Sequence, residues 1–243
     1  MRYAHTARLL RTIGAHKSSA QKGRNVIVWG GVMPRDWQLT PLSSIAKFVG
    51  GYSYKGNELQ PSNIAMAIIK NFESRRGFKL NGYKEIVPSD RLRKEHYLQL
   101  FDTIVAYTDL TQNADVIGNA EMILSKSHYN KIVFSMDVVK VIPTKHIPKF
   151  LLSSILQSKQ FKSHCLGYVN GTTVLHLSKN ALNDYKCFLP SDEKILSKIN
   201  AVLEELFTKR ALIYEENRHL SAIRDTLLPK LMSGELDVSE VRV

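Results

Sequence analysis

The sequence predicts an α+β fold, in which a mixed globular domain precedes a long C-terminal helix of the coiled-coil type. Up to residue 190, short segments rich in β-branched residues alternate with short amphipathic segments. After residue 190, a run without glycine extends to Gly234 and carries apolar residues at alternating steps of four and three. This spacing is typical of a helix that packs against another helix.

Charge divides the chain into unequal parts. The 243 residues carry a formal net charge of +12, which favours a polyanionic partner. Residues 1–35 hold seven Lys or Arg and no Asp or Glu, whereas residues 191–243 hold eight Lys or Arg and ten Asp or Glu. Because the helix is the least basic part of the chain, we expect it to serve in packing and as a spacer rather than to bind DNA. The predicted divisions are a poorly ordered basic leader at 1–33, with an organelle transit peptide as the alternative, the globular domain at 34–190, the helix at 191–232 and a tail at 233–243.

The elements of the globular domain follow from the spacing of apolar residues. Alternating or continuous β-branched runs indicate strands, and apolar residues three and four positions apart indicate helices. Polar, glycine- or asparagine-containing stretches between them indicate loops. Strands are predicted at 25–33 (or a buried turn), 63–69, 103–107, 116–124, 131–142, 174–177 and 185–189, and helices at 41–49, 89–99, 146–160 and 178–183.

The C-terminal helix is predicted to pair with a second helix. A rod of roughly 55 Å has no way to bury an apolar stripe of this length on its own. Ser191 or Asp192 is the expected N-cap, and Pro229 and Gly234 are expected to mark the stop. An ordinary long core helix is the alternative. The predicted dimerisation face consists of Ile195, Ile199, Val202, Leu206, Ile213, Leu220, Ile223 and Leu227.

Signatures of catalysis are absent from the sequence. It contains no P-loop, dinucleotide-binding glycine pattern, nucleophile elbow or zinc-protease motif, and no evident carboxylate cluster for a catalytic metal. No run approaches about 18 consecutive apolar residues, so no membrane span is expected. Cys165 and Cys187 lack metal or disulfide spacing and are predicted to be core thiols in a reducing compartment. We therefore assign no catalytic residue, metal ligand or cofactor to this chain.

Candidate nucleic-acid contacts come from charge, aromatic content and loop composition. Basic residues interleave with Phe and Tyr in segment 70–84, which is typical of a nucleic-acid face, although a solvated loop is the alternative. Base reading needs paired donors and acceptors, which Arg, Asn and Gln side chains supply. The predicted DNA-binding residues are Tyr54, Lys55, Lys70, Arg75, Arg76, Lys79, Lys84, Gln112, Asn113, Tyr168, Asn170 and Thr172.

The end of the helix carries a recognisable pattern. Residues 224–236, RDTLLPKLMSGEL, closely resemble the end of specificity (S) subunits of Type I restriction–modification enzymes. Earlier pieces agree in order and spacing, and the resemblance covers about residues 34–238. These pieces are Trp37, Leu42 with Ile45, and segments 102–106, 171–173, 177–182 and 188–190.

The resemblance implies a function for each part of the chain. The domain would be a target-recognition domain that reads one half of a split target in double-stranded DNA, and the helix would be a spacer. The implied partners are methyltransferase (M) subunits, the restriction (R) subunit and a second S half, as a homodimer, in the prokaryotic cytoplasm. S-adenosylmethionine, ATP and Mg would belong to partner subunits, and the chain itself would not be an enzyme.

Family members usually carry two recognition domains, each followed by a long helix, with the two helices antiparallel. This chain has one of each and is interpreted as a half-sized or truncated form. Two alternatives stay open. One is a truncated scaffold that binds M subunits without reading DNA, and the less favoured one is a DNA-acting enzyme.

Overall fold

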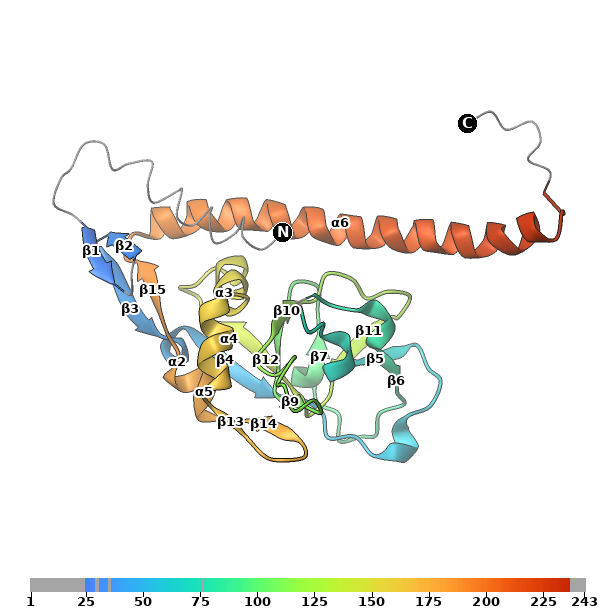
Figure 1. The fold of residues 1–243 in the computed structure, drawn as a ribbon, viewed down its shortest axis with the longest axis horizontal. Helices are drawn as coiled ribbons and strands as arrows, with labels where there is room; N and C mark the ends of the chain where they lie inside the picture. The colour runs from blue at the N-terminus through green and yellow to red at the C-terminus, as the bar shows by residue number, and fades with distance from the viewer. Residues whose placement is uncertain (1–24, 29–30, 35, 76, 237–243) are drawn as a thin grey trace.

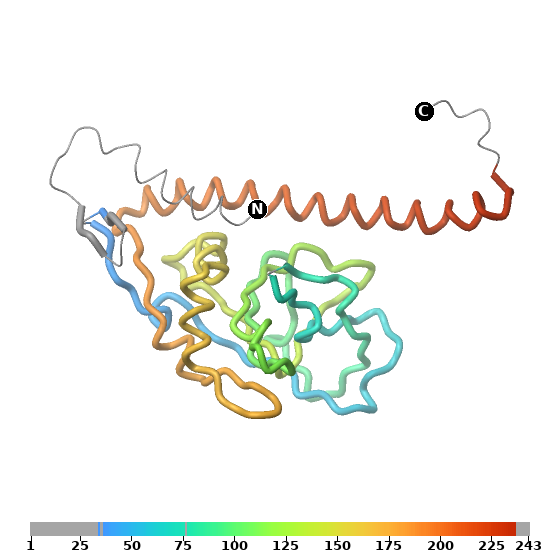
Figure 2. Tube along the Cα trace, in the orientation of Figure 1, coloured from blue at the N-terminus to red at the C-terminus, as the bar shows by residue number. Residues whose placement is uncertain are grey.

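The protein consists of a mixed α+β domain beside one long helix. The computed structural model describes residues 25–28, 31–34, 36–75 and 77–236. The helix, α6 (Glu193–Met232), has 40 residues and runs along one side of the domain (Figures 1 and 2). The predicted fold class is therefore confirmed. No helix in these ranges is long and apolar enough to cross a membrane.

Two paired strands join the beginning of the domain to its end. Strand β3 (Trp37–Pro41) pairs antiparallel with β15 (Lys186–Pro190) over their full lengths. The Ser191 hydroxyl then donates to the Asp36 carbonyl at 2.7 Å. This pairing fixes the point at which the chain leaves the domain and enters α6.

Two four-stranded sheets form the centre of the domain. The remaining strands are β1 (Asn25–Val28), β2 (Gly31–Pro34), β4 (Ala46–Gly50), β5 (Ile64–Ala67), β6 (Lys84–Glu85), β7 (Tyr97–Leu98), β8 (Thr103–Ala106), β9 (Thr108–Asp109), β10 (Ala120–Met122), β11 (Lys131–Phe134), β12 (Val138–Pro143), β13 (Val169–Asn170) and β14 (Leu175–Leu177). The central sheets have the orders β10-β8-β12-β4 and β6-β5-β11-β7, and β5 with β11 is a parallel pair. A smaller sheet has the order β13-β14-β9, and β1 pairs antiparallel with β2 where the predicted leader, 1–33, meets the domain. Residues 1–24, 29 and 30 of that leader lie outside the described ranges.

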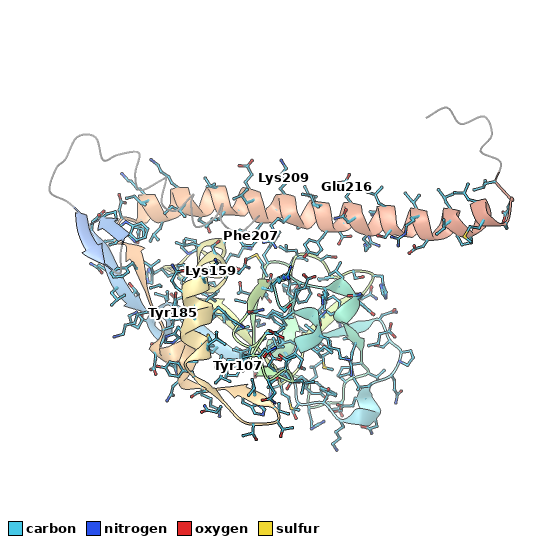
Figure 3. All side chains as sticks on the ribbon, in the orientation of Figure 1. Tyr107, Lys159, Tyr185, Phe207, Lys209 and Glu216 are labelled. Atoms are coloured by element: carbon cyan, nitrogen blue, oxygen red, sulfur yellow. The ribbon has the colours of Figure 1, made fainter. Side chains whose placement is uncertain are left out.

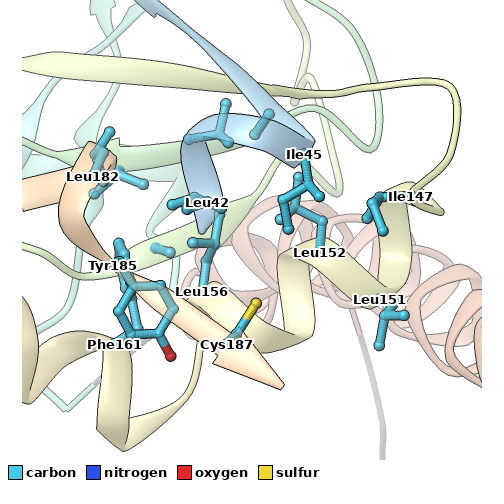
Figure 4. Close-up of a cluster of buried hydrophobic side chains, with 14 of the residues drawn as sticks. Leu42, Ile45, Ile147, Leu151, Leu152, Leu156, Phe161, Leu182, Tyr185 and Cys187 are labelled. Carbon is cyan, nitrogen blue, oxygen red and sulfur yellow. The ribbon is translucent and has the colours of Figure 1, made fainter. Parts of the chain in front are cut away.

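Short helices cover one end of the first central sheet. They are α2 (Leu42–Ile45), α3 (Lys149–Leu156), α4 (Lys159–Leu166) and α5 (Asn180–Asp184), and single 3-10 turns are η1 (Gly56–Glu58), η2 (Ile69–Asn71), η3 (Leu80–Gly82) and η4 (Lys94–His96). The largest buried cluster joins α2, α3, α4, α5 and β15, and Figure 4 shows part of it. The same cluster continues into α6, where the Phe207 ring stacks on Phe150 at 5.8 Å. Both predicted core thiols, Cys165 and Cys187, are buried and free.

Some predicted elements differ from the observed ones. Segment 41–49 is helical only over α2 and then continues as β4, which pairs with β12. Segment 89–99 is mostly irregular, because Leu98 is buried in β7 opposite Ile132 and sheet pairing overrides the local helical pattern. Segment 131–142 turns at 135–137 and supplies one strand to each central sheet.

The two ends of α6 also correct the sequence interpretation in part. Asp192 is the N-cap, as predicted, and its carboxylate accepts from the Lys194 N–H at 2.8 Å. Pro229 does not stop the helix, which continues to Met232. Pro229 leaves the Asp225 carbonyl without its helical donor, but that residue is exposed, so water replaces the lost partner. Gly234 follows the helix with φ +74°.

Candidate nucleic-acid interface

The loop that follows β9 is held in shape by the buried carboxylate of Asp109, which is 1% exposed. Its Oδ1 accepts from the N–H and the hydroxyl of Thr111, both at 2.8 Å. Its Oδ2 accepts from the N–H groups of Val116 at 2.6 Å and Ile117 at 3.1 Å. Burial by itself would raise the pKa of Asp109, but these hydrogen bonds to the ionised form outweigh it and lower the pKa. The loop is thus built around a fixed negative charge.

A lysine from α4 holds the other side of this loop. The Lys162 ammonium donates to the carbonyl oxygens of Ala114, Asp115 and Ile117 at 3.0, 3.2 and 2.6 Å. Gly118 has φ +74°, and a Cβ there would lie 2.5 Å from the Cys165 Cβ. Held from both sides, the loop presents its exposed side chains in a defined arrangement.

The tip of the β13–β14 hairpin lies against this loop. The Gln112 side-chain amide donates to the Thr172 carbonyl at 2.7 Å and to the Thr173 carbonyl at 3.4 Å. Gly171 permits the hairpin turn, because it has φ +110° and a Cβ would lie 2.2 Å from the Val174 carbonyl oxygen. The structure therefore brings two predicted contact segments together, at the edge of the domain remote from α6 (Figure 1). Four predicted residues are exposed there: Gln112, Asn113, Asn170 and Thr172.

The aromatic residues of segment 70–84 are placed differently from the prediction. Phe72, Phe78 and Tyr83 are buried, and their rings meet edge to face at 6.1 Å and 5.6 Å. Asn71 closes the segment by donating from its side chain to the Lys79 carbonyl at 2.7 Å. These rings fill the core and offer no face for stacking on a base, so the aromatic part of the predicted nucleic-acid face is corrected.

Segment 70–84 contacts both α6 and the loop that follows β9, where the Asn119 side chain donates to the Glu73 carbonyl at 2.9 Å. The Tyr214 hydroxyl of α6 donates to the Phe78 carbonyl at 3.1 Å. Lys70, Arg75 and Lys79 are exposed, whereas Lys84 in β6 is half-buried. Arg76 lies outside the described residues. The predicted DNA-binding residues therefore come from several parts of the domain, and the Gln112–Thr172 hydrogen bond joins two of these segments.

Tyr54 and Lys55 precede a loop that a carboxylate organises. Tyr54 is half-buried against a core cluster, and Lys55 is exposed. The Glu58 carboxylate accepts from the Lys55 N–H and from the Tyr52 hydroxyl, both at 2.7 Å. A hydrogen bond from the Ser89 side chain contributes most to lowering the pKa of Glu58 to about 2, although burial opposes it.

Tyr168 is engaged within its own domain. Its hydroxyl donates to the Asp184 carboxylate at 2.9 Å, and this hydrogen bond raises the pKa of Tyr168. Asp109 and Lys162, which position the loop, escaped the sequence analysis. The Asp-x-Thr pattern at Asp109 was the available signal, because it is typical of a turn closed by the Asp side chain. Lys162 gives no such signal, since its partners are carbonyls about 45 residues away in sequence.

Two faces of α6 carry apolar residues, and the domain covers only one of them. Leu196, Ile199, Leu203 and Phe207 are buried against the domain. The predicted dimerisation face therefore needs correction at Ile199, which is 3% exposed, and at Ile195, which is half-buried against the same cluster. At 3.6 residues per turn, both lie where the two faces meet. The other predicted residues are exposed: Val202, Leu206, Ile213, Leu220, Ile223 and Leu227.

Comparison with known proteins gives a consistent picture, although no family model matches the chain. The chain is 22% identical over 218 residues to the Type I restriction enzyme MjaIX specificity subunit of Methanocaldococcus jannaschii. The aligned stretch covers 86% of this chain and 46% of that protein. The crystal structure of the Type I S subunit from M. genitalium superposes with a TM-score of 0.51 and 16% identity, over 81% of this chain and 46% of that chain. The HsdS subunit from Thermoanaerobacter tengcongensis gives a TM-score of 0.47 and 12% identity, over 96% of this chain and 52% of that chain.

The chain thus spans about half the length of the relatives it matches. The M. genitalium structure shares the fold of an α+β domain beside a long helix. The M. jannaschii protein extends the similarity to the sequence itself. In sequence and in fold, the chain resembles one half of a specificity subunit of a Type I restriction–modification enzyme.

Proposed function

We propose that the chain is the DNA sequence-specificity component of a Type I restriction–modification complex and reads one half of a bipartite target in double-stranded DNA. The observation that carries this proposal is the pair of segments joined by the Gln112–Thr172 hydrogen bond. Both segments expose amide and hydroxyl groups on backbones that Asp109, Lys162 and Gly171 hold in place. Fixed donors and acceptors are what base recognition in the major groove requires.

The exposed lysines and arginines supply the contacts that do not depend on sequence. Lys55, Lys70, Arg75 and Lys79 are exposed and suited to phosphate oxygens. The chain has no catalytic role of its own in this proposal. M subunits with S-adenosylmethionine perform methylation, and the R subunit with ATP and Mg performs cleavage.

A second specificity half recognises the other half of the bipartite target. The exposed face of α6 supplies the surface for it, and a homodimer reads an interrupted palindrome because each copy reads the same half-site. In this arrangement α6 sets the distance between half-sites, and its acidic balance agrees with a task away from the DNA phosphates.

Selection from a random duplex library tests the reading function. The full chain is incubated with the library at moderate salt, and the bound fraction is sequenced. We expect an enriched base pattern that Gln112→Ala changes, while affinity at low salt stays nearly constant. Gln38→Ala is the matched control, since Gln38 is also exposed but lies on the boundary strand β3.

The same experiment separates the alternatives. Salt-dependent binding without any enriched pattern would overturn sequence reading. Loss of DNA binding altogether, with retained capture of M subunits, would favour the scaffold instead.

A further inference from the structure

The β13–β14 hairpin carries an exposed histidine that is not among the predicted DNA-binding residues. Leu175 and Leu177 of β14 are buried, and His176 between them is exposed. Because side chains alternate between the two faces of a strand, the leucines face the core and His176 faces outward. Among the described residues, none forms a hydrogen bond or an ion pair with the His176 side chain. Its ring nitrogens are therefore open to an external partner.

Asn170 stands directly opposite His176. The antiparallel register of β13 and β14 pairs these two residues, and both are exposed. Side chains at directly opposite positions lie on the same face of a sheet, with Cβ atoms about 5 Å apart. One N–H of the Asn170 amide donates to the Tyr168 carbonyl at 3.3 Å, which leaves its second N–H and its oxygen available. The outward face of the hairpin thus presents an amide and an imidazole side by side.

The hairpin that carries this pair is held on several sides. Strand β14 also pairs with β9, where His176 lies opposite Thr108. At the tip, the Gln112 amide donates to the Thr172 and Thr173 carbonyls at 2.7 and 3.4 Å. A side chain on a strand with partners on both edges is presented more precisely than one on a free loop. Gln112 is therefore a positioning residue for the hairpin.

The hairpin lies on the side of the domain remote from α6. Figure 1 shows β13 and β14 extending from that side. The Leu177 N–H donates to the Tyr107 carbonyl at 2.8 Å, and Figure 3 shows Tyr107 far from the helix, whereas Phe207 lies against it. Both residues of β9, Thr108 and Asp109, are buried in the domain. The part that projects is therefore a two-stranded ribbon.

A two-stranded ribbon has the right size for one of the two DNA grooves. Its strands lie about 4.8 Å apart. The major groove is about 12 Å wide and admits such a ribbon, whereas the minor groove is only about 6 Å wide. The major groove also displays purine N7, which accepts hydrogen bonds, and the adenine edge that an Asn side chain contacts through two hydrogen bonds.

We propose that the β13–β14 hairpin enters the major groove and that His176 is a specificity-determining residue, whose imidazole N–H donates to N7 of a purine. Asn170 reads a neighbouring base pair, because a Cβ separation of about 5 Å spans one to two steps of about 3.4 Å along a DNA strand. This inference rests on the proposed DNA reading and adds the groove, the element that enters it and a further contact residue.

Selection from the random duplex library tests the assignment of His176. We expect His176→Ala to lose the base preference at one position of the enriched pattern, and Asn170→Ala to lose it at a neighbouring position. His146→Ala is the matched control, because His146 is also exposed but lies beside the first turns of α6. His176→Thr is a second variant that keeps a residue favourable in strands, and urea midpoints equal to that of the wild type establish that the variants are folded.

Atomic substitution in the DNA tests the groove and needs no change in the protein. Each purine of the selected half-site is replaced in turn by its 7-deaza analogue, which lacks the N7 acceptor and keeps Watson–Crick pairing. We expect one replacement to lower the affinity of the wild-type chain about threefold to tenfold, as the loss of one hydrogen bond does. The same replacement should leave the affinity of His176→Ala unchanged.

Three results overturn the inference. One is a base pattern that the His176 variants leave unchanged. Another is a uniform loss of affinity with an unchanged pattern, which would make His176 a phosphate contact. The third is wild-type affinity that no 7-deaza purine lowers.

The wild-type selection separates this inference from the proposed function. If the wild-type chain enriches no pattern, DNA reading fails and the assignment of His176 fails with it. If the wild-type chain enriches a pattern that His176→Ala and His176→Thr leave intact, only the assignment of His176 fails.

Discussion

Replacing Asp109 by asparagine removes the charge that shapes the candidate reading loop. The carboxylate accepts hydrogen bonds from Thr111, Val116 and Ile117 at 2.6 to 3.1 Å and is 1% exposed. An asparagine keeps one acceptor oxygen and turns its NH₂ group toward donors, so two of the four bonds are lost. Burial of the Asp109 side chain limits their replacement by water. At about 1–3 kcal/mol for each buried donor left without a partner, we expect Asp109→Asn to lower the free energy of unfolding by about 3 kcal/mol.

Urea unfolding followed by circular dichroism measures this change. The transition midpoint should fall while the slope against urea stays constant, since the surface exposed on unfolding is the same. Asp115→Asn is the matched control, because it makes the same chemical change in the same loop without removing the loop's central acceptor. We expect its effect to stay within about 0.5 kcal/mol. Equal destabilisation by the two variants would refute the role assigned to Asp109.

Three further predictions concern other parts of the chain. Phe207→Ala should lower the free energy of unfolding by about 3–5 kcal/mol, because it leaves a cavity where α6 packs on the domain. Glu204→Ala, on the exposed surface of the same helix, should leave the urea midpoint nearly unchanged. Gly171→Ala should change the base pattern selected from a random library, because the hairpin must deform to admit the Cβ, and Gly56→Ala, which has open space, should not change it. The ionised form of Glu58 contributes stability that is fully present above about pH 4.5 and is lost as pH falls toward about 2. The destabilisation caused by Glu58→Gln in urea titrations should therefore shrink over that range, and a constant difference would contradict it.

The sequence predicted the architecture because its signals were local and repeated. The run from Asp192 to Gly234 contains a capping residue, heptad spacing and a terminal glycine, and each acts within a few residues of itself. Strands such as β8 and β15 were recognisable from continuous β-branched or apolar runs. The family resemblance also lay in contiguous strings, so it needed no tertiary information.

The candidate site could be predicted only in part. Gln112 and Thr172 were named from the polar character of their loops, yet their hydrogen bond joins residues 60 positions apart. Phe78 was taken for a surface aromatic because it stands among basic residues, and it is 5% exposed. Residue type in a loop indicates chemistry, but its exposure depends on which distant segment packs over it.

The long helix separates what the sequence determined from what tertiary structure decided. Sequence alone determined that a helix exists here, where its cap lies and that it carries unpaired apolar residues. With 3.6 residues per turn, this helix carries one apolar face that the domain covers and a second that stays exposed. The residue spacings of the two faces coincide at Ile199. Only the folded domain, through Phe150 and its neighbours, decided that Leu203 and Phe207 are covered while Leu206 and Ile213 stay exposed. That choice depends on contacts with segments distant in sequence, which no local periodicity encodes.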